Sequence, residues 1–179
     1  NVSANTIQQS GDHGIELDSV SNSRLLANDV SDSGKNGLHV TSQDGNSSND
    51  NFLIGNTIDN SGRHGINLQP AVDGNTNNVS GNTILANKVF NSDKAGVRLR
   101  AGNDGVVNNN SLNANTVEDS GQQGIQVKES GGGQTDNNDV LKNTVERSGR
   151  EGIQVNRGDN NNICLLYTSP SPRDNRLSR

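Results

Sequence analysis

The chain has 179 residues and a net charge of -5, with 27% hydrophobic and 2% aromatic residues. No apolar stretch approaches the ~20 residues of a membrane span. Neither a basic stripe nor a set of stacking rings is present, which argues against a nucleic-acid partner. So few hydrophobic residues are typical of disorder, unless they recur at fixed positions and share one narrow core.

The hydrophobic residues do recur, in a unit that repeats six times. Each unit has an apolar residue, an Asn three positions later, a β-branched residue two positions after that, and a Gly before an apolar-x-apolar triplet. The stretch from Asn to triplet keeps its length, so length changes fall in the polar segments between units. In chain order the pairs are Asn5–Gly14, Asn28–Gly37, Asn56–Gly65, Asn87–Gly96, Asn115–Gly124 and Asn143–Gly152.

Each unit predicts three short strands: at its first apolar residue, at the β-branched residue and over the triplet. The first unit places them near Val2, Ile7 and 15–17, and the last near Val140, Val145 and 153–155. Units stacked at a spacing of ~4.8 Å would share one continuous core. We expect the Asn to adopt left-handed backbone and to bond to the Asn of the next unit.

These columns predict an all-β fold, a single-stranded solenoid of about six rungs with three strands each, which is a right-handed parallel β-helix. Over residues 1–163 the chain resembles the parallel-β-helix repeat family of pectin-lyase-like proteins. Because Met is absent and the repeat already runs at Val2, we expect the chain to be an internal piece of a longer protein.

The pattern stops at residue 163, which divides the chain into a repeat domain, 1–163, and a tail, 164–179. The next Asn, Ile or Val, and Gly of the repeat would fall at 166, 168 and 175, which are Leu, Thr and Asn. The tail resembles translated adaptor sequence and is expected to be disordered; a genuine linker is the alternative. The tail carries three Arg and one Asp, or +2, so the repeat domain carries -7 against -5 for the whole chain.

The alternation within the triplets predicts which side chains face outward and are available for chemistry. Because successive rungs lie ~5 Å apart, Arg98, Arg100 and Lys128 are expected to form one cationic patch, next to the amides of Asn67 and Gln69. Arginine forks bind carboxylates, so we predict that these five residues bind the carboxylates of a uronic-acid chain. The alternative is a solvated surface whose like charges are relieved by nearby carboxylates.

The segment RHGINL, residues 63–68, resembles the RHG-aromatic-N segment of alginate (mannuronan) epimerases, in which it borders the groove of a β-helix. The resemblance implies that Arg63 contacts a substrate carboxylate and that His64 assists proton transfer at the adjoining sugar carbon. The corner that holds both residues is polar and varies between units, so we expect it to face solvent. His39, outward on the preceding triplet, is the second candidate catalytic residue.

Several features of the related enzymes are missing. The Asp-Pro-His motif of those epimerases has only Glu16 and Asp18 in its place, and residues 1–163 contain no Tyr for proton transfer. Neither the Asp cluster of a Ca²⁺-dependent pectate lyase nor a calcium-roll repeat is present, so no metal site and no cofactor are expected, with Ca²⁺ binding without a motif as the alternative. Opposed carboxylates, as in a polygalacturonase-like hydrolase, cannot be placed either.

Three functional hypotheses follow. The first is a secreted or cell-surface β-helix protein, epimerase- or lyase-like, that acts on or binds acidic polysaccharide. The second is a non-catalytic glycan-binding, adhesin-like or tailspike-like segment, and the third is a purely structural stack. Scarce aromatic residues favour anionic over neutral glycans. Open strand edges at the ends of such a stack predict end-to-end self-association.

Overall fold

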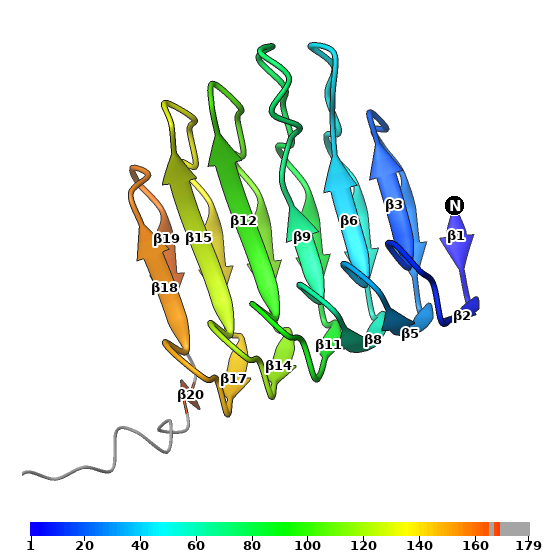
Figure 1. Ribbon diagram of the computed structural model, residues 1–179. Coiled ribbons are helices and arrows are strands. Elements are labelled where there is room, and N and C mark those ends of the chain that lie inside the picture. Colours follow the sequence, from blue (N-terminus) through cyan, green and yellow to red (C-terminus); the bar gives the residue numbers. More distant parts are fainter. Residues whose placement is uncertain (165–166, 169–179) are drawn as a thin grey trace, which may run out of the picture.

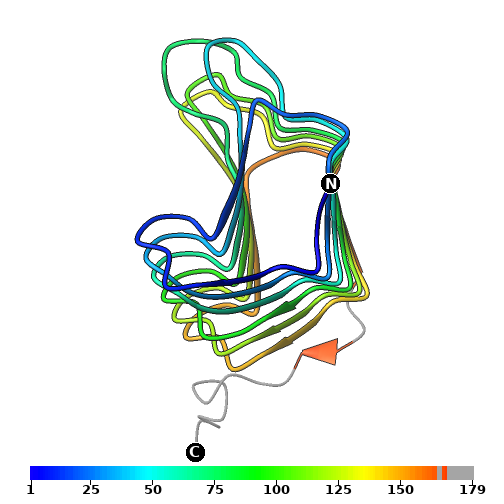
Figure 2. The same ribbon diagram turned by 90° about the vertical axis from the view of Figure 1, so that its right-hand side faces the viewer.

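The protein is described here by a computed structural model that covers residues 1–164 and 167–168, and this part of the chain contains strands and turns but no helix. The strands form three parallel sheets, which the chain visits in turn on every circuit (Figure 1). Viewed along the stack, the three sheets surround one interior (Figure 2), which a single cluster of hydrophobic side chains fills. The predicted all-β solenoid with three strands per rung is therefore confirmed. In the described residues, no helix is long and apolar enough to cross a membrane.

Each sheet is built from one strand position of the repeat, and the sheets have seven, seven and six strands. Sheet A consists of β1 (Val2–Ser3), β4 (Arg24–Leu26), β7 (Phe52–Ile54), β10 (Thr83–Leu85), β13 (Ser111–Asn113), β16 (Asp139–Leu141) and β19 (Asn162–Cys164). Sheet B consists of β2 (Thr6–Gln8), β5 (Asp29–Ser33), β8 (Thr57–Ser61), β11 (Lys88–Val89), β14 (Thr116–Glu118), β17 (Thr144–Glu146) and β20 (Tyr167–Thr168). Sheet C consists of β3 (Ile15–Asp18), β6 (Leu38–Thr41), β9 (Ile66–Leu68), β12 (Val97–Gly102), β15 (Ile125–Ser130) and β18 (Ile153–Asn156).

The register places equivalent residues of successive rungs next to each other. In sheet C, Ile66 pairs with Leu38 on one side and with Val97 on the other. Apart from the terminal rungs, the inward columns of all three sheets are buried and pack into one cluster that runs along the axis. Burial of each Leu or Ile side chain contributes about 1.5–3 kcal/mol, so the sparse hydrophobic residues suffice because every rung places them in the same core.

The predicted Asn column forms a buried hydrogen-bond ladder at the corner between sheets A and B. The Oδ1 of Asn87 accepts the backbone N–H and the Nδ2 of Asn56, both at 2.9 Å. The Nδ2 of Asn87 in turn donates to the Leu53 carbonyl at 2.8 Å and to Asn115 Oδ1 at 3.0 Å. The left-handed backbone lies one residue earlier than predicted, at Ala86 with φ 53°. The residue before the Asn adopts the left-handed conformation, and the Asn side chain forms hydrogen bonds with the backbone of the turn.

The Gly before each triplet marks a close approach between rungs. A Cβ added to Gly65 would lie 2.1 Å from Val89 Cγ1 and 2.8 Å from the Gly96 carbonyl oxygen. Both atoms belong to the next rung and neither can move without disturbing the stack. The same steric requirement is found at Gly14, Gly37, Gly96 and Gly124, which explains why Gly recurs at this position.

Strand pairing continues past residue 163, the predicted end of the repeat domain. Cys164 pairs with Leu141, and Tyr167 pairs with Thr144. The predicted boundary therefore falls inside β19. Strand pairing continues beyond it because pairing uses backbone groups, which every non-proline residue carries. The rest of the predicted tail, 165–166 and 169–179, lies outside the described residues.

Candidate functional site

A groove runs along the outer face of sheet C. The turns that join sheet B to sheet C (the B–C turns) project on one side of this sheet. The loops that join sheet C to sheet A (the C–A loops) project on the other (Figure 2). Two cavities, of about 310 Å³ and 370 Å³, lie along the groove and share His64 and Arg98 in their walls. The two cavities therefore adjoin on the outer face of sheet C.

The outward residues of the triplets form one in-register row on the floor of the groove. From the first rung to the last, the row is Glu16, His39, Asn67, Arg98, Gln126 and Gln154. The predicted outward row is thus confirmed, and it divides the groove chemically. The row begins with a carboxylate and an imidazole, has Arg98 in its middle and ends with two amides.

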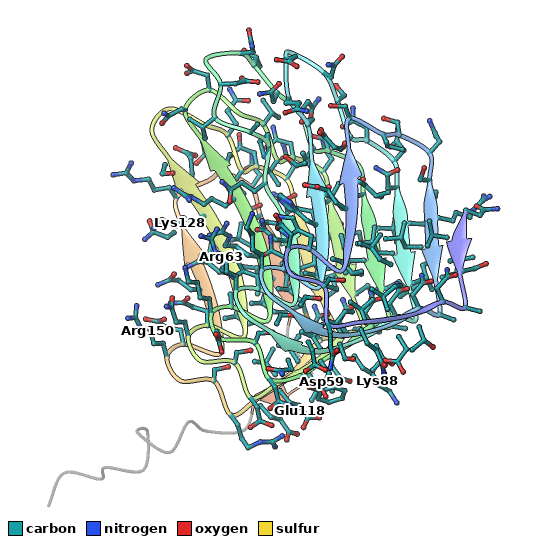
Figure 3. All side chains as sticks on the ribbon, turned by 45° about the vertical axis from the view of Figure 1, so that its right-hand side comes forward. Asp59, Arg63, Lys88, Glu118, Lys128 and Arg150 are labelled. Carbon is teal, nitrogen blue, oxygen red and sulfur yellow. The ribbon has the colours of Figure 1, made fainter. Side chains whose placement is uncertain are left out.

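The second cavity is the cationic half of the groove. Its lining has no carboxylate among the described residues and includes five cations: Lys94, Arg98, Arg100, Lys128 and Arg150. Figure 3 shows Lys128 and Arg150 on the same side of the molecule as Arg63. Arg100 pairs with Lys128 in register, as predicted. In the part of the chain that the structure describes, the ion pairs use other cations. Glu151 lies behind the lining, where a hydrogen bond from Gln123 and the charge of Arg150 lower its pKa.

Arg98 is held in place by two of the residues that were expected to bind substrate. Its Nε donates to Asn67 Oδ1 at 2.9 Å, and its Nη2 donates to Gln69 Oε1. Asn67 is only 3% exposed. Asn67 and Gln69 therefore orient the guanidinium and leave Nη1 for a ligand. Burial, followed by Arg100 and Arg63, lowers the pKa of Arg98 to about 10, so the side chain remains cationic at neutral pH.

His64 does not face solvent as expected, because only 4% of its surface is exposed. Its Nδ1 accepts the backbone N–H of Ala95 at 3.1 Å, and its own backbone N–H donates to Asn36 Oδ1 at 3.2 Å. Residues one position before the repeat Gly, such as Asn36 and His64, therefore accept a hydrogen bond from the backbone of the next rung. Since Nδ1 is an acceptor, the proton of the neutral ring resides on Nε2. His64 can donate a hydrogen bond toward the groove, but it has no free lone pair for a base.

His39 lies in the first cavity with His64, Arg63 and Arg98, so the structure brings these four predicted residues together. Its Nδ1 is 3.1 Å from Glu16 Oε1. If Nδ1 donates its proton to this carboxylate, Nε2 carries the lone pair. Burial is the largest of several effects that lower the pKa of His39 to about 3, so its ring is neutral at pH 7.

A family model described as the right-handed beta helix region matches residues 1–165. The chain belongs to the right-handed β-helix family. This match confirms the predicted handedness, which the sheet order alone does not give. Comparisons with curated proteins and with solved structures found no match. Fold does not determine function, so the activity of this β-helix must be argued from its groove.

Two cations of the β-helix groove, Lys94 and Arg150, were not among the predicted site residues. Both stand two positions before the repeat Gly. Backbone hydrogen bonds join this position from rung to rung, for example from Lys94 N to the Arg63 carbonyl at 2.7 Å. The sequence does show that this position is mostly basic. It does not show that these side chains lie close to the outward row of sheet C, because that depends on the path of the turn.

The buried His64 predicts that the β-helix loses stability in acid. Burial and the nearby Arg98 lower its folded pKa to about 3, against about 6.5 when unfolded. Its contribution is therefore complete above pH 6.5 and is lost as the pH falls toward 3, by about 1.4 kcal/mol per pH unit. We expect His64→Asn, which keeps an acceptor like that of Asn36, to reduce the loss between pH 6.5 and 4 by roughly 3 kcal/mol. Urea unfolding at both pH values measures this, and identical pH dependence in the two proteins would refute it.

Proposed function

We propose that the groove on sheet C binds an acidic polysaccharide, a uronan, along the axis of the β-helix. The observation that carries the proposal is the cationic half, where five cations line one cavity with no carboxylate among its described lining residues. The whole chain has a net charge of -5, so this concentration of cations is not a general property of its surface. Rungs ~4.8 Å apart present cations at regular steps, which suits a polymer with regularly spaced carboxylates.

The side chains of this half match the chemistry of a uronan. Arg98 offers its Nη1, and Arg100 the outer part of its guanidinium, for charge-assisted hydrogen bonds with carboxylates. Beyond them, Gln126 donates to Gln154 at 2.7 Å, and these amides can exchange such bonds for sugar hydroxyls. Aromatic residues, on which neutral sugars stack, are scarce in the chain. A secreted or cell-surface location, where such polysaccharides are met, belongs to the same proposal.

Titration of the full chain with polymannuronate, polygalacturonate and a neutral glucan tests the proposal. We expect at least one uronan to bind, and its affinity to fall by about tenfold or more between low and high salt because exposed charges are screened. The glucan should not bind. Polyglutamate serves as a flexible polyanion without sugar rings and should bind more weakly than the preferred uronan. Equal binding of glucan, equal binding of polyglutamate or no uronan binding would each contradict the proposal.

Epimerase- or lyase-like turnover is a second candidate function, favoured by the contact between His39 and Glu16. His39 Nε2 would remove the proton from the sugar carbon next to the carboxylate, while Arg98 and the Nε2–H of His64 stabilise the negative charge that develops. Deuterium uptake into the uronan from heavy water reports epimerisation, and the ultraviolet absorbance of the unsaturated sugar formed by elimination reports lyase cleavage. Absence of both signals would leave a non-catalytic glycan-binding segment, of the adhesin or tailspike type, as the function.

A further inference from the structure

At the acidic end of the groove, we infer that His13, Glu16 and His39 form a binding site for a divalent metal ion of the zinc class. Each side chain offers one ligand atom, and these atoms all lie within 4.8 Å of one another. His39 Nδ1 is 3.1 Å from Glu16 Oε1, and the two imidazole rings have centroids 4.4 Å apart. Three potential ligands thus converge in one wall of the first cavity.

The fold brings the three residues together from two rungs. Glu16 on β3 and His39 on β6 are direct partners in sheet C. His13 comes from the B–C turn of the first rung, where the backbone N–H of Asn36 donates to its Nδ1 at 3.2 Å. Neighbouring ligands of a tetrahedral zinc ion lie about 3.3 Å apart, given metal–ligand bonds of ~2.0–2.1 Å. The His39–Glu16 distance already matches, and the other ligand atoms, which are at most 4.8 Å apart, need side-chain rotations to reach this spacing.

The ligand types select the class of metal. Imidazole nitrogens with one carboxylate suit zinc and related transition ions, whereas Ca²⁺ and Mg²⁺ prefer sets of oxygen ligands. Burial lowers the pKa of both His13 and His39, so both rings are neutral at pH 7. Three protein ligands leave a further coordination position, as in catalytic rather than structural zinc sites. This position is available to a ligand in the groove.

Proton positions are consistent with metal binding when each ring presents a nitrogen without a proton. His39 does so by moving the proton that its Nδ1 shares with Glu16 to Nε2. In His13, Nδ1 already accepts a hydrogen bond, so the metal takes the place of the proton on Nε2, which now lies 3.3 Å from Asp12 Oδ1. Asp12 itself is paired with Lys35 Nζ at 2.8 Å and is not needed as a ligand.

The site is independent of the proposed uronan binding, because its ligands lie outside the cationic half. It does compete with a catalytic role for His39, since a metal bound at Nδ1 leaves the proton on Nε2, the nitrogen that would otherwise act as the base. No sequence motif predicted the site. His13 and Glu16 are three positions apart, but their partner His39 lies on the next rung, and the spacing between rungs varies.

Calorimetric titration of the full chain with Zn²⁺ and with Ca²⁺ tests the inference, with the absorption spectrum of bound Co²⁺ as a second readout. A Cys164→Ser background removes the exposed thiol, which would otherwise bind the same metals. We expect one Zn²⁺ per chain, with Ca²⁺ binding far more weakly. Glu16→Gln and His13→Asn should each lower Zn²⁺ affinity by about tenfold or more. His13→Asn keeps a capping acceptor like that of Asn36, so the corner remains satisfied.

Glu118→Gln, on sheet B and away from the groove (Figure 3), is the matched control and should bind Zn²⁺ like the parent protein. No Zn²⁺ binding, Ca²⁺ binding as tight as Zn²⁺, or unchanged affinity in Glu16→Gln would overturn the site. Because Glu16 is exposed, its variant should fold normally, and far-UV circular dichroism checks this for every variant. A parallel uronan titration of Glu16→Gln shows whether the two sites fail separately.

Discussion

Replacing Arg98 with alanine should weaken uronan binding by about thirtyfold or more. Arg98 belongs to the walls of both cavities, so any chain that follows the groove must pass it. Its fork can give a carboxylate charge-assisted hydrogen bonds, each of which contributes about 1.5–3 kcal/mol. Loss of one or two such bonds lowers affinity by at least a factor of ten for each 1.4 kcal/mol. Calorimetry or surface-immobilised uronan measures the change.

Two further variants make the Arg98 result specific. Arg24→Ala removes an arginine from sheet A, where it lies 5.6 Å from the centre of the Phe52 ring, and should leave uronan binding unchanged. Arg98→Lys retains the positive charge but not the planar fork, so its affinity should lie between those of the parent and the alanine variant. Equal losses in the Arg24 and Arg98 variants would show that only the total charge of the protein matters. Unfolding must be measured as well, because Asn67 and Gln69 lose their donor.

Replacing Asn56 with alanine should lower the free energy of unfolding by about 3–6 kcal/mol. The side chain is fully buried and makes four hydrogen bonds. Its Oδ1 accepts from the backbone N–H and the Nδ2 of Asn28, and its Nδ2 donates to the Leu25 carbonyl and to Asn87 Oδ1. Alanine leaves these partners buried without hydrogen bonds, and each such group costs about 1–3 kcal/mol.

Urea unfolding compares this variant with Asn75→Ala. Asn75 is an exposed loop residue whose backbone N–H, not its side chain, bonds to Asp73. The control should therefore stay within about 0.5 kcal/mol of the parent protein. A similarly small change for Asn56→Ala would mean that the Asn ladder is a passive feature of the turn. It would also show that water or a rearranged turn replaces the lost bonds.

The solenoid could be predicted from the sequence because residues one repeat apart are the residues that contact each other. When every unit carries Leu53 or its equivalent at the same position, stacking that residue on its counterparts is the arrangement that buries all of them together. The Asn ladder follows from the same periodicity, since identical donors and acceptors recur one rung apart. The outward row of sheet C also followed, because side chains of a strand alternate between its two faces.

Only the tertiary structure decided how deep each outward side chain lies and what it contacts. His64 and Asn67 were expected to face solvent, yet both are buried, with Asn67 in contact with the Arg98 side chain and His64 with the Ala95 backbone. The left-handed residue at the A–B corner, Ala86, carries no side-chain signal for that conformation. The proximity of His13 to His39 arises across two rungs through the path of a turn. Alternation and repeat spacing determine the order of residues along a strand and from rung to rung. The path of each turn determines how deeply a side chain is buried, which histidine nitrogen carries the proton and how far apart residues lie across the groove.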